Sequence, residues 1–179
     1  GYKYFLNLKS KIYIYIPNIV MNNLNEYILN NLEILISLGF NGILLGNIGY
    51  LELCLNLKNR YNIVIGIDYS LNVINCFSAI FYKEKNIDYI TVSNELDDIT
   101  DISKVIDVEC IDEFITVMTT RLCLIKTYMN KCDCDNFHSI FDYKNKEYHI
   151  ICDKTDCINK LVTSYINNVK CNRIRKCVI

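Results

Sequence analysis

Short apolar runs alternate with longer amphipathic stretches along the first two thirds of the chain. Runs rich in β-branched and aromatic residues predict strands, and they fall at residues 12–17, 42–45, 63–67, 89–92 and 114–118. Between them, apolar residues recur near the helical period and predict helices, at residues 24–38, 48–57, 71–82 and 98–105. Fully apolar strands separated by helices are typical of parallel sheets covered on both sides. The sequence therefore predicts an α/β fold with a mostly parallel sheet and outer helices.

The pattern changes after Arg121. Residues 123–135 are rich in cysteine and show no regular period, so we expect an irregular segment there. Residues 139–142 and 147–152 flank the polar stretch 144–146, which predicts a β-hairpin, and a closing helix is expected over residues 158–166. We therefore divide the chain into a β/α part, residues 1–121, and a cysteine-rich C-terminal segment, residues 122–179, packed together as one structural domain.

Polar side chains gather after the predicted strands, where parallel α/β folds place their active sites. Carboxylates at neighbouring strand ends can act as a general acid and a general base. The catalytic candidates are Asp68, Glu95 and Arg121. The candidates for substrate binding are Asn47, Asn72 and Ser93. The simpler interpretation is that these side chains cap helices and close turns.

Four of the ten cysteines lie in one C-terminal stretch, at Cys123, Cys132, Cys134 and Cys157. Four thiolates from separated segments can hold a zinc ion or an iron–sulfur cluster. We expect their sulfur atoms to converge, with Cys152 as a reserve ligand. The alternative is that they are loop thiols without a common function. Two further cysteines, Cys54 and Cys76, lie in predicted helices among apolar residues and are interpreted as small buried hydrophobic residues.

Composition restricts the functional classes. The 179 residues carry a net charge of −1, which provides no basic surface for nucleic acid. The sequence holds no apolar run of about 18 residues, so no transmembrane helix is predicted, and no signal peptide is visible. Ten cysteines without a secretory signal favour a reducing, cytoplasmic compartment, where they are free thiols or metal ligands. The two histidines, His138 and His149, give little support for a nucleophilic Cys–His pair.

An ordered set of short motifs resembles peptidase family U-32, the collagenase-like proteins. Residues 67–75 read IDYSLNVIN, residues 91–96 read TVSNEL, and Met118 precedes Cys123 as in that family's M-x-x-x-x-C element. Residues 140–143, IFDY, resemble the turn of the next hairpin, and Cys157 followed by residues 164–167, SYIN, resembles the ending. The resemblance covers roughly residues 42–167. Asn94 and Leu124 stand where the family usually has proline, and Tyr143 where it has arginine.

The resemblance implies a barrel-like β/α fold, here a partial TIM-barrel because the chain is shorter than the ~250 residues of eight β/α units. Several members resemble iron–sulfur proteins that support oxygen-independent hydroxylation of ubiquinone precursors or RNA bases. In those, four cysteines hold a [4Fe–4S] cluster, and the matching positions here are Cys123, Cys132, Cys134 and Cys157. Cys132 and Cys134 form C-x-C where C-x-x-C is commoner, so Cys152 is the substitute ligand.

Three functions stay open on the sequence. The first is an iron–sulfur protein acting on RNA or a small molecule. The second is a collagenase-like peptidase, and the third is a non-catalytic zinc-binding or structural domain. The expected partner is the remainder of a longer chain or a partner subunit, because the barrel would be incomplete, and no membrane partner is expected.

Overall fold

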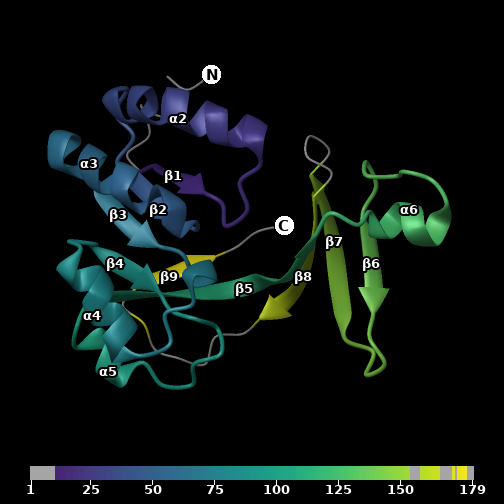
Figure 1. Ribbon diagram of the computed structural model, residues 1–179. Coiled ribbons are helices and arrows are strands. Elements are labelled where there is room, and N and C mark those ends of the chain that lie inside the picture. The colour runs from purple at the N-terminus through teal and green to yellow at the C-terminus, as the bar shows by residue number, and fades with distance from the viewer. Residues whose placement is uncertain (1–10, 154–157, 166–170, 172, 177–179) are drawn as a thin grey trace. The chain divides into compact units, whose positions relative to one another are not determined.

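The computed structural model describes residues 11–153, 158–165, 171 and 173–176 (Figure 1). They form two compact units. The first contains residues 11–110 together with residues 171 and 173, and the second contains residues 111–153 and 158–165 with 174–176. Strand β5, Asp107–Thr120, begins in the first unit and continues into the second. Each unit is described by itself.

The first unit is built on parallel strands, as the sequence predicted. They follow chain order across the sheet, from β1 to the beginning of β5. Their bounds are β1 Tyr13–Ile16, β2 Gly42–Leu45, β3 Val64–Ile67 and β4 Tyr89–Thr91. The register is regular, with Tyr13 beside Gly42 and Tyr89 beside Asp107. Because the strands are parallel and in order, their carboxyl ends lie along one edge of the sheet.

Helices connect these strands and bury one face of the sheet (Figure 1). They are α2 Asn22–Ser37, η1 Ile48–Tyr50, α3 Leu51–Tyr61, η2 Tyr69–Leu71, α4 Cys76–Glu84 and α5 Thr100–Ser103. Leu32 of α2 and Leu57 of α3 share a buried core with the strand residues Ile43, Ile65 and Ile90. Burial of each such side chain contributes about 1.5–3 kcal/mol to folding. The helices therefore attach to the sheet through its apolar face.

Tyrosine rings lie over two glycines on the other face of the parallel strands. The ring of Tyr89 lies across Gly66, its partner in the next strand, where a β-carbon would collide with the ring. The ring of Tyr13 lies across Gly42 in the same way. Glycine at these two positions is therefore required by close approach rather than by backbone freedom. The core shared with the helices lies on the opposite face, while Leu44, Tyr89 and Thr91 are buried on this one.

Cys171 and Arg173, the last described residues of the first unit, contact the start of β5. Strand β9, Arg173–Lys176, pairs with β5, and Cys171 forms a disulfide with Cys110. Arg173 Nε lies 2.6 Å from the carboxylate of Asp107, and its guanidinium lies 4.6 Å from the centre of the Tyr89 ring. The disulfide corrects the expectation that the cysteines are all free thiols or metal ligands. The two residues are 61 apart in sequence, and no local pattern marks such a pair.

The second unit is an antiparallel sheet with one short helix. The later part of β5 pairs with β8, β8 with β7, and β7 with β6. The bounds are α6 Leu124–Met129, β6 His138–Phe141, β7 Glu147–Asp153 and β8 Ile158–Tyr165. Ile125 of α6 packs with Ile150 and Leu161 in a small buried cluster. The predicted hairpin of residues 139–152 is therefore present as β6 and β7.

Four sequence-based expectations need correction. Residues 158–165 are the strand β8 rather than a closing helix, because β5 and β7 pair with them on both sides. Strand β5 begins at Asp107, seven residues before the predicted start at Phe114. The segment after Cys123 is not wholly irregular, since α6 lies in it. Helix α4 begins at Cys76 rather than Leu71, because Asn72 is left-handed at φ 55° and Asn75 caps the helix.

In the described residues, no helix has both the length and the apolar character needed to cross a membrane.

Candidate functional site

Two predicted site residues close the turns after strands β2 and β3. Asn47 accepts a hydrogen bond from the backbone N–H of Gly49 at 2.9 Å and donates one to the carbonyl of Asn18 at 3.1 Å. Asp68 is 1% exposed, and its Oδ2 accepts hydrogen bonds from the N–H of Ser70 and the hydroxyl of Tyr15, both at 3.4 Å. Both side chains therefore cap short helices, and Asp68 also holds a phenol from strand β1.

Asp68 begins a row of polar side chains at the carboxyl edge of the sheet. Ile67 pairs with Ile90, so Asp68 and Thr91 follow at the same level, and Thr91 pairs with Glu109 on β5. The buried hydroxyl of Thr91 donates to Glu109 Oε2 at 2.8 Å. Carboxylates and a phenol at this edge can exchange protons with a bound molecule. Tyr15, Thr91 and Glu109 were not among the predicted site residues. The alternation of polar and apolar residues at 107–111 indicates an earlier start of β5 and would have pointed to Glu109.

The other candidates of the first unit lie in the following loops. Ser93 is buried, and its Oγ accepts the N–H of Glu95 at 3.4 Å. The side chain of Glu95 is exposed, as is that of Asn72. Arg121 belongs to the second unit, where it is exposed in the bend after β5. Asn47, Asp68 and Ser93 thus follow adjacent parallel strands, while Glu95 and Asn72 face solvent.

Three thiols lie together in the second unit. The sulfur atoms of Cys132 and Cys134 are 3.4 Å apart. The hydrogen bond to Cys132, together with a second one to Cys152, raises the pKa of the Cys134 thiol to about 12. Cys132 is exposed and the other two are half-buried. The pair Cys132 and Cys134 was in the predicted ligand set, and Cys152 was its reserve member.

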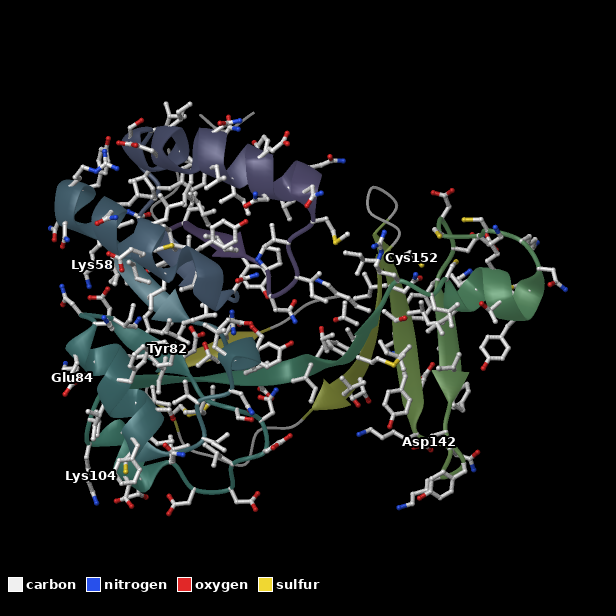
Figure 2. The ribbon with its side chains drawn as sticks, in the orientation of Figure 1. Lys58, Tyr82, Glu84, Lys104, Asp142 and Cys152 are labelled. Carbon is white, nitrogen blue, oxygen red and sulfur yellow. A yellow bond between two sulfur atoms is a disulfide. The ribbon has the colours of Figure 1, made fainter. Side chains whose placement is uncertain are left out.

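Neighbouring groups fix the positions of these thiols. The thiol of Cys152, on β7 (Figure 2), donates to Asn159 Oδ1 at 3.1 Å. Asn159 Nδ2 donates in turn to the carbonyl of Leu122 at 3.3 Å. The ring Nε2 of His138 lies 2.7 Å from the carbonyl of Asp133, the residue between the two loop cysteines. His138 therefore holds the loop that carries Cys132 and Cys134, and Asn159 holds the thiol of Cys152 on β7.

The other two predicted ligands are Cys123 and Cys157. Cys123 is the N-cap of α6, and its sulfur accepts the N–H of Lys126 at 3.4 Å. It packs against the same small apolar cluster as Cys152. Cys157 lies outside the described residues. Within the described residues, no three or more cysteine, histidine, aspartate or glutamate side chains are placed closely enough to hold a metal ion.

The chemistry of the three thiols suits a soft cation. A tetrahedral zinc ion with zinc–sulfur bonds of about 2.3 Å holds its sulfurs about 3.8 Å apart, and the Cys132–Cys134 contact of 3.4 Å is close to that separation. Thiolates repel one another unless a cation lies between them, whereas neutral thiols can lie in contact without one. Cys132, Cys134 and Cys152 therefore have the donor atoms that a soft cation prefers, but among the described residues they are not arranged closely enough to hold one.

A comparison with protein families gives one match. The model of the family described as peptidase family U32 matches residues 1–166. The curated proteins and the solved structures gave no match. The matched range contains both the strand-end row and the three thiols.

Proposed function

We propose that this chain, which belongs to peptidase family U32, is an iron–sulfur protein that takes part in oxygen-independent hydroxylation of RNA or of a quinone precursor. The observation that supports it best is the contact among Cys132, Cys134 and Cys152. Thiolates from a loop and a strand are stable beside one another only around a cation or a cluster, so this contact favours a thiolate centre. The family resemblance supplies the choice of an iron–sulfur cluster over other thiolate centres.

Cys132, Cys134 and Cys152 would hold the [4Fe–4S] cluster, and Cys123 or Cys157 would be the fourth ligand. Such a cluster supplies one-electron transfer when bound. The protein's own contribution would be the small apolar cluster of Ile125, Ile150 and Leu161, which packs against Cys123 and Cys152 and lowers the dielectric around them. His138 holds the Cys132–Cys134 loop in place through the Asp133 carbonyl.

The substrate side of the proposal uses the strand ends of a partial TIM-barrel. Asp68 and Glu95 would serve as acid and base, and Arg121 would bind a negatively charged group. The residues proposed to contact substrate are Asn47, Asn72 and Ser93. The five parallel strands are fewer than the eight of a complete barrel, so a partner subunit or the remainder of a longer chain would supply the rest.

A non-catalytic zinc domain is the second candidate. The observation that favours it is the short C-x-C spacing of Cys132 and Cys134, because their contact already approaches the sulfur separation of a zinc site.

A collagenase-like peptidase is the third candidate, and the description of the matched family supports it. The ring of His149 lies between Phe114 and Phe137, at 6.0 and 5.0 Å between ring centres, which restrains it from turning toward a cysteine.

We also propose that the protein works in the cytoplasm, where glutathione and thioredoxin keep ligand thiols reduced. The Cys110–Cys171 disulfide argues for the opposite environment. Trapping the thiols with an alkylating agent at the moment of cell lysis decides between them. A reduced pair supports the cytoplasmic location, and an oxidised pair contradicts it.

Metal analysis after anaerobic purification tests the cofactor. We expect iron and acid-labile sulfide in equal amounts, little zinc, and loss of both in the variants Cys132→Ser, Cys134→Ser and Cys152→Ser. The matched control is Cys76→Ser, a half-buried cysteine of α4 in the other unit, which should retain the iron. A colourless protein that contains one zinc ion establishes the second candidate instead. Iron content that is unchanged in all three variants contradicts the ligand assignment.

A further inference from the structure

Arg173 places a guanidinium group on the face of the parallel sheet where the Tyr89 ring covers Gly66. The central carbon of the guanidinium lies 4.6 Å from the centre of the Tyr89 ring, and Nε donates to Asp107 Oδ2 at 2.6 Å. Tyr89 and Asp107 are register partners on β4 and β5. A planar cation that lies over a ring and bonds a carboxylate gains two attractions at once, and guanidinium suits both.

The sheet itself holds the ring and the carboxylate that receive this cation. Tyr89 is 5% exposed, and its ring lies against Gly66, whose missing side chain leaves room for it. Asp107 stands at the beginning of β5 with its side chain half-buried. Both positions are set by the pairing of β4 with β5 rather than by Arg173. We call Tyr89 and Asp107 the guanidinium site.

The guanidinium site continues into the polar row at the carboxyl edge of the sheet. Thr91 and Glu109 come two residues after Tyr89 and Asp107 on the same two strands, so they lie on the same face one step further along. Asp107 and Glu109 thus place two carboxylates side by side on β5. A molecule that extends from the guanidinium site toward the row is therefore favoured by positive charge.

The residue that fills the guanidinium site lies outside the part of the chain that matches the family. The match covers residues 1–166, which include both residues of the site but not Arg173. Arg173 is held there by the disulfide of Cys171, two residues away, with Cys110, and by the pairing of β9 with β5. A group tethered so closely competes with free molecules at an effective concentration of about millimolar or above.

We propose that Tyr89 and Asp107 form a binding site for a ligand that carries a guanidinium group, and that Arg173 is a tethered competitor for this site. The proposal goes beyond the proposed function and needs no cluster. Reduction of the disulfide weakens the competitor. A dithiol supplies two electrons, the bond between the sulfurs of Cys110 and Cys171 breaks, each sulfur becomes a thiol, and the dithiol closes into a cyclic disulfide. The effective concentration of Arg173 at the site then falls.

Calorimetric titration of the full chain with arginine amide tests the site without reference to catalysis. Lysine amide is the control probe, because its ammonium has the same charge but no planar fork. A blocked glycyl-arginyl-glycine peptide distinguishes an arginine side chain in a polypeptide from a small molecule as the source of the guanidinium.

The proteins are the oxidised wild type, the wild type reduced with dithiothreitol, Arg173→Ala, and Arg173→Ala combined with Asp107→Asn. The matched control combines Arg173→Ala with Asp101→Asn, because Asp101 is an exposed carboxylate that pairs with Lys104 in the same unit. Circular dichroism checks that each protein is folded. Arg173→Ala combined with Tyr89→Leu answers the question if the Asp107→Asn protein fails to fold.

We expect Arg173→Ala to bind arginine amide about tenfold or more tightly than the oxidised wild type, with the reduced wild type between them. Adding Asp107→Asn should weaken this binding by about tenfold or more, adding Tyr89→Leu should also weaken it, and adding Asp101→Asn should leave it unchanged. Lysine amide should bind more weakly than arginine amide to Arg173→Ala.

Arginine amide that binds Arg173→Ala no better than the oxidised wild type overturns the site, as does an equal loss of affinity with Asp107→Asn and Asp101→Asn. Equal binding of arginine amide and lysine amide overturns the assignment of a guanidinium ligand. Equal binding by the oxidised and reduced wild type overturns the role of the disulfide. The iron content of the protein tests the proposed function separately, because none of these titrations depends on it.

Discussion

Thr91 donates its buried hydroxyl to the carboxylate of Glu109 across two neighbouring parallel strands, at 2.8 Å. A hydrogen bond to a charged group contributes more than one between neutral groups, because the partner's charge is only partly solvated. The bond fixes one end of the polar row that begins at Asp68. It also joins β5, the strand that continues into the second unit, to the helix-packed core.

Replacing this hydroxyl should therefore reduce stability. We expect Thr91→Val, which keeps the shape of the side chain, to lower the free energy of unfolding by about 1.5–3 kcal/mol. Urea unfolding followed by circular dichroism measures it. Thr100→Val is the control, since Thr100 makes the same kind of bond to Asp98 at 2.6 Å on the exposed surface. An equal loss of unfolding free energy in both variants would show that the buried hydrogen bond contributes no more than the exposed one.

The disulfide between Cys110 and Cys171 should stabilise the first unit. It joins residues 61 apart, and closing a loop of that length removes about 4 kcal/mol of unfolded-state entropy in the chain-entropy model. A dithiol reductant should therefore shift the urea midpoint of the wild type downward. The double variant Cys110→Ser with Cys171→Ser should unfold at the reduced midpoint whether or not reductant is present. A wild type that does not respond to reductant contradicts a formed disulfide.

The parallel strands could be predicted well from the sequence because their apolar runs must be buried within the sheet. Residues 42–45 are the same in the expectation and in β2. The prediction of a closing helix at β8 was wrong for a physical reason. Ile158, Leu161 and Val162 are spaced as on a helix, and only the neighbouring strands β5 and β7 decide that they are extended. Pairing between distant segments overrides the local period.

The candidate site was predictable where a residue follows its own strand and unpredictable where it depends on register. Asp68 directly follows β3, so its place at the sheet edge could be anticipated. Tyr15 reaches Asp68 from a strand 53 residues earlier, and Asn159 meets Cys152 only through the β7–β8 register. Such contacts require the three-dimensional arrangement and leave no local mark in the sequence.

The hairpin tip should lose stability in acid through Asp142 (Figure 2). Backbone N–H groups of Lys146 and Lys144 hold the pKa of this carboxyl below its ordinary value of 3.8. The lowered pKa means that the stabilisation is present above the unfolded value and is lost as the pH falls through the folded value. Asp142→Asn keeps an acceptor oxygen but cannot titrate, so its stability should not show this acid step.

The measurement is the unfolding midpoint between pH 6 and pH 2 for the wild type and for Asp142→Asn. Asp101→Asn is the control, because Asp101 is an exposed carboxylate with a surface ion pair to Lys104. We expect the acid step to shrink in Asp142→Asn and to persist in Asp101→Asn. Identical profiles in the wild type and Asp142→Asn would show that the turn does not depend on the ionised carboxylate.

Alkylation should rank the cysteines by burial. Cys54 is fully buried between α3 and the sheet, and burial raises its pKa to about 12, so very little thiolate exists at neutral pH. Cys132 is exposed. With iodoacetamide at pH 8, mass spectrometry should find Cys132 modified early and Cys54 last, with the half-buried Cys76 between them. Denaturant should equalise the three rates. Early modification of Cys54 in the native protein would mean that the helix-packed core opens readily, and the parallel sheet would then be too loosely held to keep Asp68 and Glu109 in one row.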